Sequence, residues 1–179
     1  MSKEIERKFI VSNDSWKELA RGIPWHYSQG YLSFGDATSP EARVRVISPP
    51  SDAPIFGLRE HSSLTFKSVG GITRDEVEMR IDIAKANELM TLCHHKPIEK
   101  VRYRVHTTNG SMFEIDVYGG GLAGLVIAEI ELPSEDAPFD QNCGFLGDEV
   151  STNKSYRNSV LAREGLPLTH KVLRHSLGG

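Results

Sequence analysis

The chain has 179 residues, 25% of them charged, and a formal net charge of -3 at pH 7. This length suits one domain with a sizeable core, which we expect to span residues 1–179. The slight excess of acid argues against a nucleic-acid or membrane surface, because such a surface needs a clear excess of basic residues. Any binding of anions must therefore depend on a local group of basic side chains.

Targeting and membrane-spanning segments are not expected. Charge occurs within the first eight positions, and no apolar run approaches the roughly 18–20 residues that span a bilayer. The two cysteines, Cys93 and Cys143, are far apart and fit neither a disulfide framework nor a zinc site. We therefore expect a cytoplasmic protein with free thiols. Its oligomeric state stays open, a homodimer included.

Alternation of apolar and polar residues predicts eight strands and three helices, separated by turn residues. Gly70-Gly71 and Asn109-Gly110 are typical of tight hairpins, because primed turns need positive φ. In chain order we expect a strand to residue 11, a helix over 16–20, strands over 27–34, 42–47, 58–68 and 72–83, a helix over 83–94, strands over 98–107, 111–118 and 125–132, a helix over 152–163 and a tail over 166–179.

Connections between these strands are short turns or single short helices, so the sheet should be largely antiparallel. Eight antiparallel strands commonly remove their edges by closing into a barrel. We therefore expect an α+β fold that is mainly antiparallel β: a closed eight-stranded barrel over about 3–132, with the helices packed outside. The roles of the 48–63 loop and of the tail do not follow from the sequence.

Ionic side chains recur along one face of most predicted strands. Side chains alternate on a strand, so Glu4, Glu6 and Lys8 share a face opposite Ile5, Arg7 and Phe9. The same spacing groups Arg43 with Arg45, Thr65 with Lys67, Arg74 with Glu76, Glu78 and Arg80, Lys100 with Arg102 and Arg104, Glu114 with Asp116, and Glu129 with Glu131.

Two interpretations of these faces compete. A solvated polar face is the usual antiparallel pattern for any one strand. Here, however, the positions are almost uniformly ionic, and like charges two residues apart repel and require a counter-charge. Turned inward, the faces would place at least seven cations and eight carboxylates in a wet tunnel. We favour this tunnel, with the apolar faces packed outward.

A tunnel with both signs of charge suits a polyphosphate accompanied by a divalent cation. Arginine and lysine bind phosphate oxygens by charge-assisted hydrogen bonds, and carboxylates bind a hard cation such as Mg²⁺. Without a metal the carboxylates would repel the anion. The histidines lack metal-ligand spacing, and Gly119-x-Gly121-x-x-Gly124 leaves no room for the helix of a dinucleotide site.

These motifs resemble the CYTH, or triphosphate tunnel metalloenzyme, superfamily. Its signature Glu-x-Glu-x-Lys appears as Glu4-Ile5-Glu6-Arg7-Lys8, and the later motifs follow in the family's order over residues 2 to about 163. The resemblance implies an eight-stranded antiparallel tunnel that hydrolyses or rearranges a triphosphate with Mg²⁺ or Mn²⁺. It leaves open which triphosphate and which of the two metals is used.

The resemblance also implies roles for individual residues. Lys154 resembles a basic residue that the family places beside the tunnel, and Tyr156 and Asn158 fit the same segment. The implied metal ligands are Glu4, Glu6, Glu114, Asp116, Glu129 and Glu131; the implied triphosphate contacts are Lys8, Arg43, Arg45, Lys67, Lys100, Arg102, Arg104 and Lys154; the implied catalytic set is Glu4, Glu6, Lys8, Lys67, Glu76, Glu78 and Lys154.

Three functions are consistent with the sequence. The first is an inorganic triphosphatase acting on tripolyphosphate. The second uses the same tunnel for an organic triphosphate, as a class IV-type adenylate cyclase or a thiamine triphosphatase, and needs a pocket for the organic group that no clear aromatic or amide cluster supplies. The third is a polyphosphate-binding module without catalysis. The shared motifs do not separate them.

Overall fold

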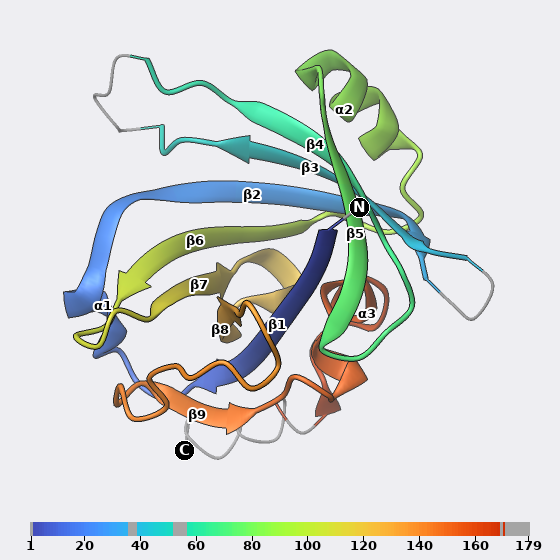
Figure 1. Ribbon diagram of the computed structural model, residues 1–179. Helices are drawn as coiled ribbons and strands as arrows, with labels where there is room; N and C mark the ends of the chain where they lie inside the picture. Colours follow the sequence, from blue (N-terminus) through green and yellow to red (C-terminus); the bar gives the residue numbers. More distant parts are fainter. Residues whose placement is uncertain (1, 36–38, 52–56, 169, 171–179) are drawn as a thin grey trace.

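The computed structural model describes the chain except residues 1, 36–38, 52–56, 169 and 171–179 (Figure 1). Most of the predicted tail and part of the 48–63 loop therefore lie outside the described residues. The strands are β1 (Ser2–Val11), β2 (Ala20–Phe34), β3 (Glu41–Ser48), β4 (His61–Lys67), β5 (Thr73–Ile81), β6 (Ile98–His106), β7 (Met112–Tyr118), β8 (Val126–Glu131) and β9 (Leu146–Glu149). The α-helices are α1 (Trp16–Leu19), α2 (Ile83–Thr91) and α3 (Asn158–Glu164).

Eight strands close into the antiparallel barrel that the sequence predicts. The hydrogen-bonded order is β5-β4-β3-β2-β6-β7-β8-β1, and pairing of β5 with β1 completes the ring. The first strand changes partners along its length: residues 2–5 pair with β5, and residues 6–10 pair with β8. The ninth strand, β9, adds to the C-terminal end of β1 and is not part of the ring (Figure 1).

Two clusters of apolar side chains point away from the barrel axis and pack against the covering segments. On one side Val44 of β3 packs with Ala86 of α2, and both side chains are fully buried. On another side Phe113 of β7 packs with Trp16 of α1 and with Phe145, which precedes β9. These two parts of the core lie outside the ring.

A third apolar cluster occupies part of the inner face. It includes Tyr31, Tyr118 and Ile127, which share a sheet face with ionic residues, and it packs with Leu161 of α3. The rest of the inner face is left mainly to polar side chains.

Several local features differ from the sequence-based expectations. The strand β2 begins at Ala20 rather than at residue 27. The predicted helix over 152–163 is interrupted: a 3-10 turn covers Lys154–Tyr156, Arg157 is extended, and α3 begins at Asn158. The strand β9 was not predicted, because Leu-Gly-Asp-Glu carries almost no apolar signal. Neither Gly70 nor Gly71 has positive φ; a side chain at Gly70 would instead lie 2.5 Å from the carbonyl oxygen of Thr73.

Candidate active site

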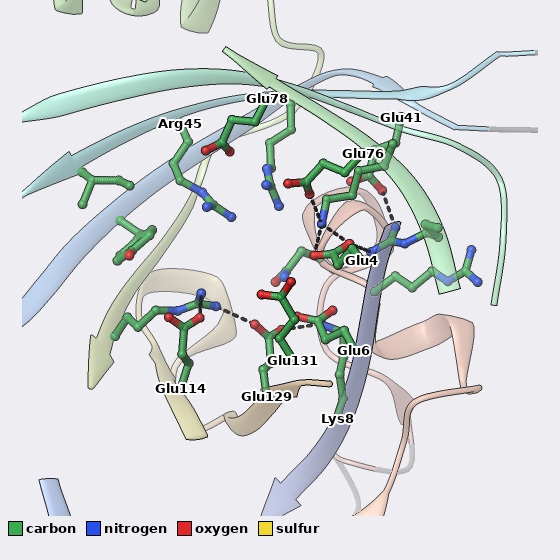
Figure 2. Close-up of a pocket in the computed structure, with 18 of the residues that line it drawn as sticks. Glu4, Glu6, Lys8, Glu41, Arg45, Glu76, Glu78, Glu114, Glu129 and Glu131 are labelled. Atoms are coloured by element: carbon green, nitrogen blue, oxygen red, sulfur yellow. Dashed lines mark hydrogen bonds and ion pairs between the residues drawn. The ribbon is translucent and has the colours of Figure 1, made fainter. Parts of the chain in front are cut away.

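The inner face of the barrel surrounds a cavity of about 340 Å³ that is lined mainly by ionic side chains (Figure 2). Carboxylates and basic groups occur there in nearly equal numbers. The acids are Glu4, Glu6, Glu41, Glu76, Glu78, Glu114, Glu129 and Glu131, and the bases are Lys8, Arg43, Arg45, Lys67, Arg74, Arg102 and Arg157. Eight acids therefore face seven bases, so the distribution of charge rather than its sum decides what the cavity binds.

Strand register places opposite charges side by side on the cavity wall. Lys8 of β1 lies across from Glu129 of β8, and Lys67 of β4 lies across from Glu76 of β5. The Lys67 amino group contacts carboxylate oxygens of Glu4 at 2.6 Å and of Glu76 at 2.8 Å. Cross-strand pairs of opposite charge stabilise a sheet and fix its register.

One part of the lining, which we call the paired wall, consists of Lys8, Arg102, Glu114 and Glu129. Arg102 forms ion pairs with Glu114, with Glu129 at 2.5 Å and with Asp116, which lies behind this wall. Lys8 also contacts Glu129. Burial alone would raise the pKa of Glu129, but Lys8 and Arg102 hold that pKa well below its usual range. Charges on this wall are therefore largely compensated before any ligand arrives.

Asp116 and Lys100 lie behind the paired wall. The Asp116 side chain is fully buried, contacts Lys100 and accepts two hydrogen bonds of 2.6 Å from Arg102. Burial lowers the pKa of Lys100 to about 8. Neither residue lines the cavity. Asp116 is thus engaged by two bases and Lys100 by Asp116, and the metal-binding role of Asp116 and the phosphate-binding role of Lys100 stay predictions.

Arg43 and Arg45 of β3 form a contrasting region, the arginine wall. Arg43 is buried and Arg45 is half-buried, and in each the Nε atom is buried without a hydrogen-bond partner. Among the described residues, no carboxylate lies within ion-pair distance of either group. Burial and the neighbouring Arg43 and Arg102 lower the pKa of Arg45 to about 10, whereas at Arg43 burial is outweighed by Tyr31 and more distant acids, which raise its pKa. Two cations with free donors and no ion-pair partner are suited to an anion.

Carboxylates crowd together opposite the arginine wall. Figure 2 shows Glu4, Glu6 and Glu131 in the same part of the cavity. Burial and the charges of Glu4, Glu76 and Glu114 raise the pKa of Glu131, and burial together with Glu129 raises the pKa of Glu6. Raised pKa values in a group of oxygen ligands fit a site where a hard cation would relieve the repulsion.

These acids do not yet form a complete metal cage. In the part of the chain that the structure describes, no three acidic, histidine or cysteine side chains converge closely enough to hold a metal ion by themselves. Glu4 is also engaged by Lys67. A hard cation in this cavity would therefore need further oxygen ligands, which waters and phosphate oxygens supply in many Mg²⁺ sites.

The C-terminal segment contributes Arg157 and Asn158 to the lining. Arg157 donates a 2.6 Å hydrogen bond to the carbonyl oxygen of Gly70, and Tyr118 donates one of 2.6 Å to Asn158. Lys154, which the resemblance implied, is exposed and lies outside the lining. Arg104 is likewise exposed at its end of β6 and is not brought to the cavity.

The remaining sequence-derived site residues do line the cavity, and their individual roles stay predictions. Sequence reasoning missed further lining residues, chiefly Glu41, Arg74 and Arg157 and the aromatic residues Tyr27 and Tyr31. Two of these carried a usable signal: Glu41 precedes Arg43 by two positions, and Arg74 precedes Glu76 by two, so each shares a strand face with a recognised motif.

Two known inorganic triphosphatases are similar in sequence to most of this chain. No family model matches the chain. An inorganic triphosphatase of Acetivibrio thermocellus is 41% identical over 165 residues, covering 91% of this chain and 95% of that protein. An inorganic triphosphatase of Nitrosomonas europaea is 35% identical over 164 residues, covering 89% of this chain and 96% of that protein.

Solved structures agree with this similarity. The crystal structure of an inorganic triphosphatase matches with a TM-score of 0.59 at 30% identity, covering 93% of this chain and 99% of that one. A Hippeastrum protein, described as an adenylyl cyclase candidate with dominant triphosphatase activity, has a TM-score of 0.53 at 15% identity and supports the fold alone. Within the described residues no helix has the length and apolarity to cross a membrane. The chain belongs to the inorganic triphosphatases of the CYTH, or triphosphate tunnel metalloenzyme, superfamily.

Proposed function

We propose that this protein hydrolyses inorganic tripolyphosphate in the barrel cavity with the help of a divalent cation. The observation that carries the proposal is the separation of charge inside the cavity: the arginine wall offers uncompensated cations, and the acids around Glu6 and Glu131 repel one another. A flexible, highly charged anion with a bound cation complements both regions. The names of the two curated relatives support the same substrate.

Glu4, Glu6 and Glu131 are the residues that we expect to hold the cation, with Glu114 and Glu129 near enough to assist on the same cavity lining. Their carboxylate oxygens suit Mg²⁺ or Mn²⁺. When bound, such an ion would neutralise phosphate charge and lower the pKa of a bound water. Asp116 is left out of this set, because its oxygens are taken by Lys100 and Arg102.

The basic residues would either bind phosphate oxygens directly or orient acids and phosphates. Arg43 and Arg45 would bind phosphate oxygens directly, because their donors are free. Lys8, Lys67 and Arg102 already have carboxylate partners, so they would orient acids and phosphates together. Phosphoryl transfer depends mainly on positioning and on stabilising charge, so a serine or cysteine nucleophile is not required.

The proposal is tested by measuring phosphate release from tripolyphosphate, ATP and thiamine triphosphate in parallel, each with Mg²⁺, Mn²⁺ or EDTA. We expect tripolyphosphate to be preferred and EDTA to abolish turnover. The ATP reaction is also examined for cyclic AMP. Turnover of an organic triphosphate alone would favour the adenylate cyclase or thiamine triphosphatase alternative, and metal-dependent binding without turnover would favour a binding module.

Substitution of the proposed ligands gives a second test. Glu4→Gln and Glu6→Gln keep side-chain size but remove the charge, and we expect each to reduce turnover about 100-fold or more. Glu18→Gln, on the exposed surface of α1, is the matched control. Wild-type rates in both cavity variants would show that these carboxylates do not hold the cation.

The cellular site of this activity is also part of the proposal. Both Cys93 and Cys143 are free thiols. Free thiols are usual in a reducing compartment, which supports action in the cytoplasm.

A further inference from the structure

Gln29 is a buried polar residue that the proposed chemistry does not use. It lies on β2 between Tyr27 and Tyr31, which line the cavity, and it pairs in register with Arg45 of β3. Its side chain is completely shielded from solvent, and it does not itself reach the lining of the cavity. An uncharged amide in this position among so many ionic groups requires an explanation.

Both ends of the amide are occupied, and their orientation follows from the chemistry of the partners. A guanidinium group has donors only, so the Gln29 carbonyl oxygen must face Arg45, whose nitrogen lies 3.4 Å away. The Gln29 amide nitrogen donates a 2.9 Å hydrogen bond to the Tyr31 hydroxyl. Gln29 therefore connects the buried phenol of Tyr31 to the half-buried Arg45 without carrying charge.

The second member of the arginine wall is held in the same manner. An Arg43 nitrogen lies 3.4 Å from the Thr65 hydroxyl, which in turn donates a 2.8 Å hydrogen bond to Glu78. Thr65 thus separates Arg43 from the nearest acid along this path. Arg102, by contrast, is held by three carboxylates. Neutral supports accompany the uncompensated arginines, and acidic supports accompany the compensated one.

We propose that Gln29 is a positioning residue that keeps Arg45 directed into the cavity without neutralising it, so that the full charge of Arg45 is available to the terminal and bridging oxygens of a polyphosphate. This inference rests on the proposed function for the identity of the anion. A carboxylate in place of the amide would form the same contact with Arg45 but would cancel its charge. The uncharged amide at position 29 would then contribute to selectivity for highly charged anions.

The test uses two substitutions of similar size. Gln29→Glu introduces a charge beside Arg45, and Gln29→Met removes both hydrogen bonds while staying neutral. Gln141→Glu, at an exposed position, is the control for added negative charge. Calorimetric titration with tripolyphosphate and with pyrophosphate in EDTA measures Kd without turnover, and steady-state rates with Mg²⁺ give KM and kcat separately.

We expect Gln29→Glu to raise the Kd for tripolyphosphate about 30-fold or more, because a full charge at close range is cancelled in a buried site. The loss should be smaller for pyrophosphate, which carries less charge, whereas a general disruption of the fold would weaken both ligands equally. KM should rise more than kcat falls. Gln29→Met should raise Kd about threefold, because Arg45 keeps its charge but loses a hydrogen bond that directs it, and Gln141→Glu should match the wild type.

Two results would overturn the inference: wild-type affinity in Gln29→Glu, or an equally large loss in Gln29→Met, since the second would make packing rather than neutrality the reason. Failure of the proposed function gives a different pattern. A wild-type protein that binds tripolyphosphate in EDTA but does not hydrolyse it with any metal would remove the proposed activity and leave the role of Gln29 measurable. A wild-type protein that neither binds nor hydrolyses tripolyphosphate would overturn both.

Discussion

Arg45 and Arg102 show how neighbours decide the role of identical side chains. Their guanidinium carbons lie at the same distance, 5.2 Å, from the ring centroid of Tyr27. Arg102 is surrounded by Glu114, Asp116 and Glu129, whereas Arg45 has a neutral amide as its polar partner. The paired wall is therefore suited to holding geometry, and the arginine wall is suited to binding an anion. Each wall should respond differently to substitution.

The largest effect on stability is expected behind the paired wall, at Asp116. Asp116→Asn leaves Lys100 buried without a counter-charge and weakens the support of Arg102. Breaking one side of a buried ion pair usually costs about 3–5 kcal/mol, and we expect a loss of this size in the free energy of unfolding. Urea denaturation followed by circular dichroism measures it.

The exposed pair of Arg7 with Glu149 provides the comparison for this measurement. Exposed ion pairs contribute about 0–1 kcal/mol, so Glu149→Gln should change the free energy of unfolding by no more than that. Equal losses in the two variants would show that the Asp116 network is no more important to stability than a surface pair.

A loss of binding without a loss of stability is expected on the arginine wall. Arg45→Met removes an uncompensated, half-buried charge, so the free energy of unfolding should stay the same or rise by about 1–2 kcal/mol. Affinity for tripolyphosphate should fall about 100-fold, which corresponds to about 2.7 kcal/mol. Arg59→Met, at an exposed position, is the control. A destabilised Arg45→Met that still binds tripolyphosphate normally would contradict the distinction between the walls.

Strand alternation was sufficient to predict which face of each strand carries the site. The period of two in Glu4, Glu6 and Lys8 holds whatever the partner strands are, and the turn residues between short strands predicted the closed barrel. These features are local, and a single sequence contains them. How far along the barrel axis a side chain lies cannot be read from neighbouring residues, because it depends on strand register and on how the ring of strands closes.

Lys100, Arg102 and Arg104 demonstrate the limit. All three share one face of β6, yet one is buried behind Asp116, one reaches the cavity and one is exposed. The C-terminal segment shows a second limit: the resemblance implied that Lys154 lies beside the tunnel, whereas the structure brings Arg157, the extended residue before α3, to the cavity.

The pH dependence of metal binding should reflect the raised pKa values of Glu6 and Glu131 rather than the lowered pKa of Glu129 on the paired wall. Glu6 and Glu131 have raised pKa values, so protons compete with a cation there at a higher pH than for an ordinary carboxylate. Affinity for Mn²⁺ should therefore fall as pH falls, and the fall should begin at a higher pH than for a site of ordinary carboxylates, by up to about tenfold per pH unit for each proton displaced. Glu129 stays ionised to a lower pH than these two acids, because Lys8 and Arg102 lower its pKa.

Titration of Mn²⁺ binding at several pH values, followed by electron paramagnetic resonance, checks this dependence. Glu131→Gln should weaken binding near pH 7.5 and also flatten the pH profile, because one of the competing carboxylates is gone. Glu18→Gln, on the surface, should change neither. A flat profile in the wild-type protein would mean that Glu6 and Glu131 are not the groups that meet the cation.

The smallest effect is expected at Arg157, which tests where the arginine wall ends. Its guanidinium donates to the neutral carbonyl oxygen of Gly70 rather than to an acid, so it resembles Arg45 more than Arg102. It is only partly buried, however, and solvent weakens its attraction for a phosphate. Arg157→Met should therefore raise KM for tripolyphosphate about threefold to tenfold with a smaller change in kcat.

Lys154→Met should raise KM less than Arg157→Met does, and Lys17→Met, on the surface of α1, is the control. If Lys154→Met raised KM more than Arg157→Met did, the segment from 154 to 158 would have to change its position when substrate binds. The position of Lys154 in the free protein would then differ from its position in the complex with substrate.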